Sequence, residues 1–280
     1  MKTLPIIQPS ELLKLKPQAF VLIDASAGSK ARYDESHLSG AFYADVNTDL
    51  ANITDFAMGG RHPLPTLAQF SSVLQKFGIA KDTHVIVYDD KNASNAAARF
   101  WWMLKAVGHE KVQVLNGGFN AAIKAGFETT SVVPTAKKAD AYAVSNWSLP
   151  LADIHEVEVA SKTGNQTIVD VRDANRYAGL TEPIDLIAGH IPNAINIPFT
   201  ENLDEDGLFL SPEILKQKYK AVLANSKAEN TIVHCGSGIT ACHMLLAMDY
   251  AGLAILPKLY VGSWSEWSRN NKEMILAPKP

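Results

Sequence analysis

The sequence predicts an α/β protein with two tandem domains, each a mostly parallel central sheet flanked by helices. Three observations lead to this prediction. Short apolar runs of strand length alternate with segments whose apolar residues follow helical spacing. The same order of segments occurs twice along the chain, which indicates two copies of one domain. The 280 residues, 47% of them hydrophobic, are enough for two packed cores.

The first copy alternates strands and helices. Its predicted strands are residues 20–25, 84–88 and 112–115, its predicted helices are residues 67–77 and 96–107, and residues 37–45 form a turn that leads into a short strand. Gly78 and Gly108 follow the two helices, and glycine is the residue that most often ends a helix.

The second copy repeats this order. Its predicted strands are residues 167–172, 231–235 and 256–261, its predicted helices are residues 211–223 and 240–251, and residues 189–198 correspond to the turn and short strand. Ser211 as N-cap and Pro212 at the first helical position mark the start of one helix. Right-handed crossovers make each sheet mostly parallel.

The segment between the copies has no clear period. It is polar and contains Pro134, so it is typical of a linker. We therefore expect a first domain at residues 1–130, a linker at residues 131–145 and a second domain at residues 146–280.

Cys235 distinguishes the two copies. Aligning the strands at residues 84–88 and 231–234 places Asp89 opposite Cys235. A carboxylate cannot perform thiol chemistry, so the first domain is predicted to be catalytically silent. Cys235 itself ends a strand and precedes a glycine-rich turn at the start of a helix. The amide groups of such a turn and the positive end of the helix dipole stabilise a thiolate, which indicates a reactive cysteine.

Several motifs occur in an order that resembles a known family. They are Asp24-Ala25-Ser26, His37-Leu38-Ser39-Gly40-Ala41, Gly59-Gly60-Arg61-His62-Pro63-Leu64-Pro65, Asn116-Gly117-Gly118, Gly189-His190-Ile191-Pro192-Asn193-Ala194, His234-Cys235-Gly236-Ser237-Gly238-Ile239-Thr240-Ala241 and Val261-Gly262-Ser263-Trp264. Together they resemble the tandem-domain rhodanese sulfurtransferases over nearly the whole chain. The resemblance implies two rhodanese-like domains and catalysis in the second one.

The resemblance implies ping-pong covalent catalysis at Cys235. The thiolate takes sulfur from 3-mercaptopyruvate or thiosulfate, forms a persulfide, and passes the sulfur to cyanide or to a thiol, including a thioredoxin-like reductant. The uncharged turn resembles the 3-mercaptopyruvate type, whereas the thiosulfate type carries two cations there. No cofactor or metal is implied.

The residues expected to bind the substrate are Arg176, Gly236, Ser237, Gly238, Ile239 and Thr240. Thr240 is equally well explained as a helix N-cap. The resemblance also suggests that His37 relays a proton with Ser237, and a structural hydrogen bond of His37 within its own turn is the alternative. Arg176 matches the first of two arginines that hold the donor in the 3-mercaptopyruvate type. Asp185 stands in the segment of the second, where it would remove a cation and could repel an anionic donor.

Three other sites fit the sequence less well. The segment from Gly236 to Ala241 fits a dinucleotide fingerprint, but the next strand does not end in an acidic residue. Cysteine phosphatases require an arginine six positions after the cysteine, and Ala241 stands there. A zinc site with Cys235 and Cys242 would have to span about two helical turns, roughly 10 Å, which one ion cannot bridge easily.

Composition limits the remaining choices. The net charge of −3 gives no reason to expect a nucleic-acid partner, and two cysteines make a disulfide framework implausible. No apolar run approaches the roughly 18 residues that span a bilayer, and no signal-peptide pattern occurs, so we expect a cytoplasmic protein without a membrane partner. The non-enzymatic alternative is a rhodanese-like binding, regulatory or persulfide-carrier protein, for which loss of the cysteine would be the mark.

Overall fold

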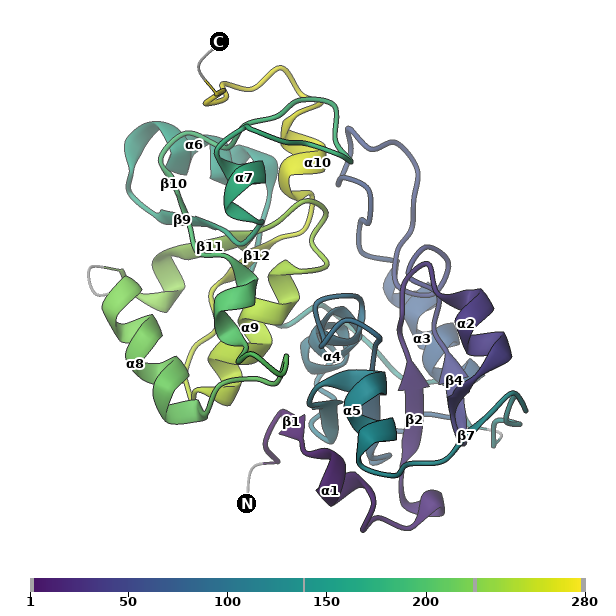
Figure 1. Ribbon diagram of the computed structural model, residues 1–280. Helices are drawn as coiled ribbons and strands as arrows, with labels where there is room; N and C mark the ends of the chain where they lie inside the picture. The colour runs from purple at the N-terminus through teal and green to yellow at the C-terminus, as the bar shows by residue number, and fades with distance from the viewer. Residues whose placement is uncertain (1–2, 138, 224–225, 278–280) are drawn as a thin grey trace. The chain divides into compact units, whose positions relative to one another are not determined.

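A computed structural model describes residues 3–137, 139–223 and 226–277. The chain divides into two units (Figure 1). The first unit contains Met1–Asn52, Pro65–Ser148 and Glu205–Phe209, and the second contains Ile53–Leu64, Leu149–Asp204 and Leu210–Pro280. Each half of the chain therefore contributes one short segment to the other unit. None of the helices formed by the described residues is both long and apolar enough to cross a membrane.

The first unit is a parallel five-stranded sheet with helices. Its elements are β1 (Ile6–Ile7), α1 (Pro9–Leu12), η1 (Pro17–Ala19), β2 (Val21–Asp24), α2 (Lys30–Glu35), β3 (His37–Leu38), β4 (Ala41–Tyr43), α3 (Leu67–Lys76), β5 (Val85–Tyr88), α4 (Ala97–Ala106), β6 (Val112–Leu115), α5 (Gly118–Lys124) and β7 (Thr129–Thr130). The sheet has the order β1-β6-β5-β2-β4. Strands β3 and β7 form a separate antiparallel pair.

The second unit has the same architecture. Its elements are β8 (Leu151–Ala152), α6 (Ile154–Thr163), β9 (Thr167–Asp170), α7 (Ala174–Tyr177), β10 (Ala194–Asn196), η2 (Phe199–Asn202), α8 (Pro212–Val222), η3 (Ala228–Asn230), β11 (Thr231–His234), α9 (Ala241–Tyr250), β12 (Lys258–Tyr260) and α10 (Ser263–Trp267). Its parallel sheet has the order β10-β9-β11-β12-β8, which repeats the order β4-β2-β5-β6-β1 of the first unit. The predicted α/β class and the internal repeat are thus confirmed.

The core of the second unit fixes the end of strand β11. Ile168 and Ile232 are fully buried and lie in register on neighbouring strands β9 and β11. They belong to an apolar cluster with Val157 of α6 and with Trp264 and Trp267 of α10. In Figure 1, α8 and α9 lie on one side of this sheet, and α6 and α10 lie on the other. Helices thus cover both faces of the sheet. Cys235 follows β11 directly and therefore lies at the carboxyl edge of the sheet.

The expected linker is part of the first unit. Tyr142 is buried and its hydroxyl lies 2.9 Å from Nδ1 of His109, while its carbonyl accepts a hydrogen bond from Ser71. Trp147 stacks with Trp102. These two aromatic side chains tie a polar stretch to the unit, which extends to Ser148.

The short segment Ile53–Leu64 joins the second unit through its backbone. The Gly59 amide donates to the Glu266 carboxylate at 2.7 Å, and the Arg61 amide donates to the Ser265 hydroxyl at 3.0 Å. These bonds bring Arg61 and His62 into the unit that contains Cys235. The boundary expected from the sequence did not include this exchange, because a segment that crosses between units leaves no signal in composition.

Candidate active site

The Cys235 loop, residues 235–240, joins β11 to α9. Helix α10 holds its first residues from the side. The Cys235 amide donates to the Ser263 hydroxyl at 3.2 Å, and the Cys235 and Gly236 carbonyls accept from the amides of Trp264 and Ser265 at 3.0 and 2.8 Å. The cysteine is nearly buried, with 2% of its surface exposed. These hydrogen bonds fix the backbone of Cys235 at the end of strand β11, where the sequence predicted it.

Two arginines lie beside Gly236. A Cβ atom added to Gly236 would stand 3.1 Å from Nη2 of Arg61 and 3.3 Å from Nη2 of Arg176. Arg176 comes from α7, a short helix that begins after the N-cap Asp173. Arg61 comes from the segment that the first half of the chain contributes. The predicted site residue Arg176 is thus next to the loop, together with Arg61, for which no role was expected.

Carboxylates orient these arginines. Glu182 accepts from Arg176 at 2.7 Å and from Arg172 at 3.1 Å. Burial alone raises the pKa of Glu182, but the hydrogen bond from Arg176 and neighbouring amides outweigh it, so the pKa is lowered. Asp185 accepts from Nε of Arg61 at 3.1 Å and from Arg269 at 3.1 Å. The repulsive carboxylate expected at Asp185 is instead a buried partner of arginines.

A histidine lies at Ser237. Nδ1 of His62 is 2.9 Å from the Ser237 hydroxyl oxygen, within hydrogen-bond distance. Ser237 is buried and sits two residues after Cys235. A hydroxyl next to an imidazole is a pair that can move a proton near neutral pH. His62 is a candidate site residue that the sequence reasoning did not single out, although the motif containing it was recognised as part of the resemblance.

His37 belongs to the first unit, where backbone atoms surround it. Its Nδ1 lies 2.7 Å from the Tyr33 carbonyl, its Nε2 lies 3.2 Å from the Val132 carbonyl, and its ring stacks on Tyr33. The equivalent His190 of the second unit makes two of these contacts, since its Nδ1 lies 2.7 Å from the Tyr177 carbonyl and its ring stacks on Tyr177. A contact present in both copies is a feature of the fold, which supports the structural alternative for His37.

The other predicted loop residues occupy distinct positions. Gly238 has a φ of +74°, and a Cβ there would lie 2.4 Å from the Val261 carbonyl oxygen. Ile239 is buried. Thr240 stands at the N-cap position of α9, but its side chain does not cap the helix. Thr240 therefore occupies the N-cap position that was its alternative explanation, without a side-chain hydrogen bond that caps the helix.

The corresponding loop of the first unit holds its own carboxylate. Asp89 follows β5 as Cys235 follows β11. Its buried carboxylate accepts hydrogen bonds from four backbone amides, those of Lys91, Ala93, Asn95 and Ala97, at 2.9–3.2 Å. A loop at this edge of the sheet thus presents amides to an anion. In the first unit the side chain of Asp89 fills that place.

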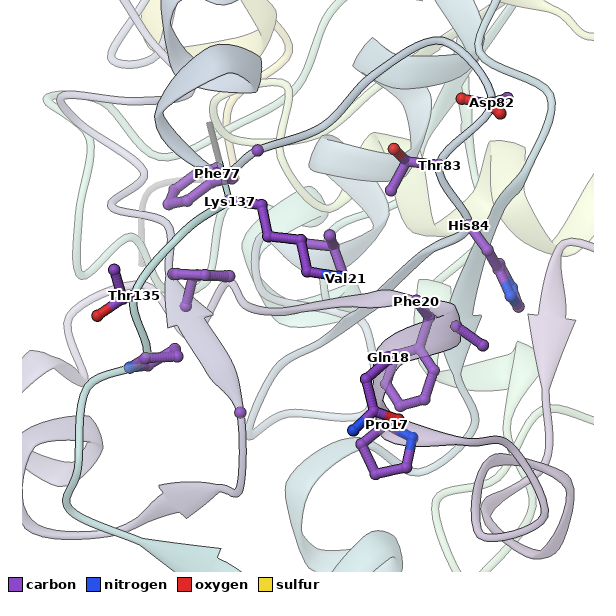
Figure 2. A pocket seen from close by; sticks show the side chains of 15 residues that line it. Pro17, Gln18, Phe20, Val21, Phe77, Asp82, Thr83, His84, Thr135 and Lys137 are labelled. Carbon is purple, nitrogen blue, oxygen red and sulfur yellow. The ribbon is translucent and has the colours of Figure 1, made fainter. Parts of the chain in front are cut away.

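A different pocket lies in the first unit (Figure 2). Phe20, Phe77, Thr83, His84 and Lys137 are among the residues that line it. Nε2 of His84 lies 2.8 Å from the Gln113 side-chain oxygen, and burial lowers the pKa of His84. No cysteine lines this pocket, so it offers no second thiol site. Among the described residues, no group of three or more His, Cys, Asp or Glu side chains could hold a metal ion.

The comparisons with known proteins identify the family of the chain. The family model described as the rhodanese-like domain matches residues 8–125 and 153–270. A probable 3-mercaptopyruvate sulfurtransferase of Pseudomonas aeruginosa is 40% identical over 89% of this chain and 86% of its own length. The thiosulfate sulfurtransferase of Rattus norvegicus is 36% identical over 86% of this chain and 80% of its own length.

Solved structures show the same relationship. The 3-mercaptopyruvate sulfurtransferase from Leishmania major superposes with a TM-score of 0.82 at 30% identity, covering 94% of this chain and 74% of that one. Both halves of the chain match the family model, and the relatives named above are sulfurtransferases of either donor type. The chain therefore belongs to the rhodanese family and is a sulfurtransferase with two rhodanese-like domains.

Proposed function

We propose that Cys235 carries the transferred sulfur as a persulfide. The Cys235 thiolate attacks the sulfur of an anionic donor, 3-mercaptopyruvate or thiosulfate, and a new S–S bond forms. With 3-mercaptopyruvate the C–S bond breaks, and its electron pair leaves with carbon as the enolate of pyruvate, which then takes up one proton. With thiosulfate the S–S bond breaks, and sulfite leaves with the electron pair.

In the second half-reaction the nucleophile is the acceptor. A thiolate or cyanide attacks the outer sulfur, the persulfide S–S bond breaks, and the Cys235 thiolate returns to its starting state. The acceptor gains the sulfur as a persulfide or as thiocyanate. A thioredoxin-like dithiol is the protein acceptor that we propose, because its second thiol would resolve the persulfide formed on the first.

One observation supports this proposal most strongly. The loop that contains Cys235 also places Gly236 next to the guanidinium groups of Arg61 and Arg176, and it places Ser237 next to His62. Three consecutive residues, 235–237, thus supply the nucleophile and lie next to two cations for an anionic donor and to a group that can supply a proton. Guanidinium groups favour carboxylate and other oxyanions, and the uncharged loop adds no further cation.

Mass spectrometry of the intact protein tests the persulfide. Incubation with either donor should add about 32 Da, one sulfur atom, to the native chain, and the adduct should disappear on addition of cyanide. Cys235→Ser should gain no such mass, whereas Cys242→Ser should behave like the native protein. An adduct that persists in Cys235→Ser would disprove the proposed mechanism.

The cytoplasmic location expected from the sequence stays a prediction. Fractionation of cells that produce the full chain, followed by immunoblotting against markers of each compartment, would check it. Recovery with the membrane fraction would contradict it.

A further inference from the structure

Asp185 binds Arg61, an arginine of the segment Ile53–Leu64, beside the Cys235 loop. We infer that Arg61 is the second arginine that binds the donor, acting together with Arg176 on the carboxylate and keto oxygens of a 2-oxo acid thiol such as 3-mercaptopyruvate. This inference rests on the proposed function, because it deepens the donor choice of the same site. Arg61 stands far in sequence from position 185, where the family resemblance leads one to expect the cation.

The two guanidinium groups converge on one place. The position of a Cβ at Gly236 lies 3.1 Å from Nη2 of Arg61, and 3.3 and 3.6 Å from Nη2 and Nη1 of Arg176. Gly236 is the residue directly after the nucleophile Cys235. A side chain at position 236 would occupy the space in front of both arginines, so glycine keeps that space open beside the thiol.

Asp185 holds Arg61 in this position. Its carboxylate accepts from Nε of Arg61 at 3.1 Å and contacts Nη2 at 3.5 Å, so it lies along one edge of the guanidinium plane. The Asp185 side chain is fully buried and also accepts from Arg269. A carboxylate held between arginines in this way does not repel the donor, and it orients the arginine that replaces the expected cation.

Both arginines belong to a network of buried and half-buried ion pairs beside the loop. Four arginines form ion pairs with three carboxylates, and these residues are Arg61, Arg172, Arg176, Arg269, Asp170, Asp185 and Glu182. The donor carboxylate is attracted through its direct contact with Arg61 and Arg176, while the Glu266 carboxylate, bound to the Gly59 amide, lies on the backbone side of the same segment. Because the pairs are largely buried, the interaction with the donor carboxylate is screened less than it would be on the surface.

Donor groups are available on both arginines. Arg61 and Arg176 use Nε and Nη2 for carboxylates, and within the described part of the chain Nη1 of neither side chain makes a hydrogen bond. Their side chains remain 19% and 18% exposed, so solvent reaches them. Planar guanidinium groups bind carboxylates through two parallel bonds, which suits a planar 2-oxo acid better than tetrahedral thiosulfate.

Equilibrium binding to the Cys235→Ser protein tests the role of Arg61 without sulfur transfer. Isothermal titration calorimetry with 3-mercaptopyruvate, and with pyruvate as a probe that lacks the thiol, should give a dissociation constant about tenfold higher or more for Arg61→Gln. Arg61→Lys keeps the positive charge but lacks the planar guanidinium group, so its dissociation constant should rise less than that of Arg61→Gln. Circular dichroism of each variant would confirm that it is folded.

Arg269→Gln is the matched control, because Arg269 donates to the same Asp185 oxygen as Nε of Arg61. It should weaken binding by less than about threefold. Equal losses in the two variants would mean that Arg61 acts only by holding Asp185, and would overturn the inference. Unchanged affinity in Arg61→Gln would overturn it too. Failure of the native protein to form a persulfide would instead disprove the proposed function, whatever the binding results.

Discussion

Among single residues, the contact between Ser237 and His62 predicts a difference between two donors. The enolate released from 3-mercaptopyruvate needs a proton, whereas the sulfite released from thiosulfate does not. Glutamine at position 62 can still hydrogen-bond to Ser237 but cannot titrate near neutral pH. His62→Gln should therefore lower kcat about 100-fold or more with 3-mercaptopyruvate, and change kcat with thiosulfate by less than about fivefold, in steady-state assays.

His37→Gln is the control for this prediction. His37 lies between the carbonyls of Tyr33 and Val132, so its replacement should lower the thermal stability and affect kcat with the two donors equally. A loss with 3-mercaptopyruvate alone in His37→Gln would assign the proton relay to His37 and would contradict the role of His62.

The residues of the site differ in how well the sequence reveals them. Cys235, Ser237 and Gly238 lie within four consecutive residues, and the comparison with Asp89 in the first copy already isolates the thiol. Asp185 shows the limit of this reasoning, because its negative charge led us to expect repulsion of an anionic donor, whereas its carboxylate binds two arginines. Its effect depends on arginines that lie 124 and 84 positions away in the chain. Such contacts are fixed by the fold, and a single sequence does not encode them in a local pattern.

At the level of elements, the turn after β11 depends on a backbone that only glycine adopts without strain. Gly238 has a φ of +74°, and an alanine Cβ there would approach the Val261 carbonyl oxygen to 2.4 Å. Gly238→Ala should therefore displace the loop, lower kcat/KM about 100-fold and reduce the free energy of unfolding by about 2–4 kcal/mol. Urea denaturation and steady-state kinetics would measure both effects.

Gly252→Ala provides the comparison for that experiment. Gly252 follows helix α9 with a similar φ of +78°, but nothing lies within 4 Å of an added Cβ. Gly252→Ala should lower the free energy of unfolding by about 1 kcal/mol, because alanine is strained at a positive φ. It should leave kcat/KM within about twofold of the native value. If both variants lost the same stability and activity, the close approach to Val261 would not matter.

Strands and helices were predicted well because their signals are local. The strand predicted at residues 112–115 is β6, and the helix predicted at residues 67–77 is α3, which Thr66 begins with a capping box. The stretch at residues 131–145 was predicted less well. Its polar composition is typical of a linker, but Tyr142 is buried and hydrogen-bonds to His109 within the first unit. Contacts of this kind depend on residues far away in the chain, and the composition of the stretch does not reveal them.

For the whole molecule, buried histidines predict a loss of stability in mild acid. Burial lowers the pKa of His84 and His109 in the first unit and of His234 in the second, where the Asp170 carboxylate offsets only part of the effect. Below about pH 6.5 the unfolded chain binds protons that the folded chain does not. The free energy of unfolding should therefore be nearly constant from pH 7 to 8 and fall as the pH decreases from 6.5 to 5. Asp89 acts in the opposite direction, because burial raises the pKa of its carboxyl to about 6, but one such group offsets only part of the effect of three histidines.

His109 allows this linkage to be tested at one position. Nε2 of His109 lies 2.8 Å from the Thr83 carbonyl and Nδ1 lies 2.9 Å from the Tyr142 hydroxyl, so a neutral ring satisfies both contacts. His109→Gln should be less stable than the native protein at pH 7.5, but it should lose less stability on acidification, by at most about 1.4 kcal/mol per pH unit for one proton. Urea denaturation at pH 7.5 and 5.5 measures the difference. An equal loss in both proteins would mean that His109 takes up its proton alike in the folded and unfolded states, and the acid sensitivity would then have to arise elsewhere, first of all at His234 beside the reactive cysteine.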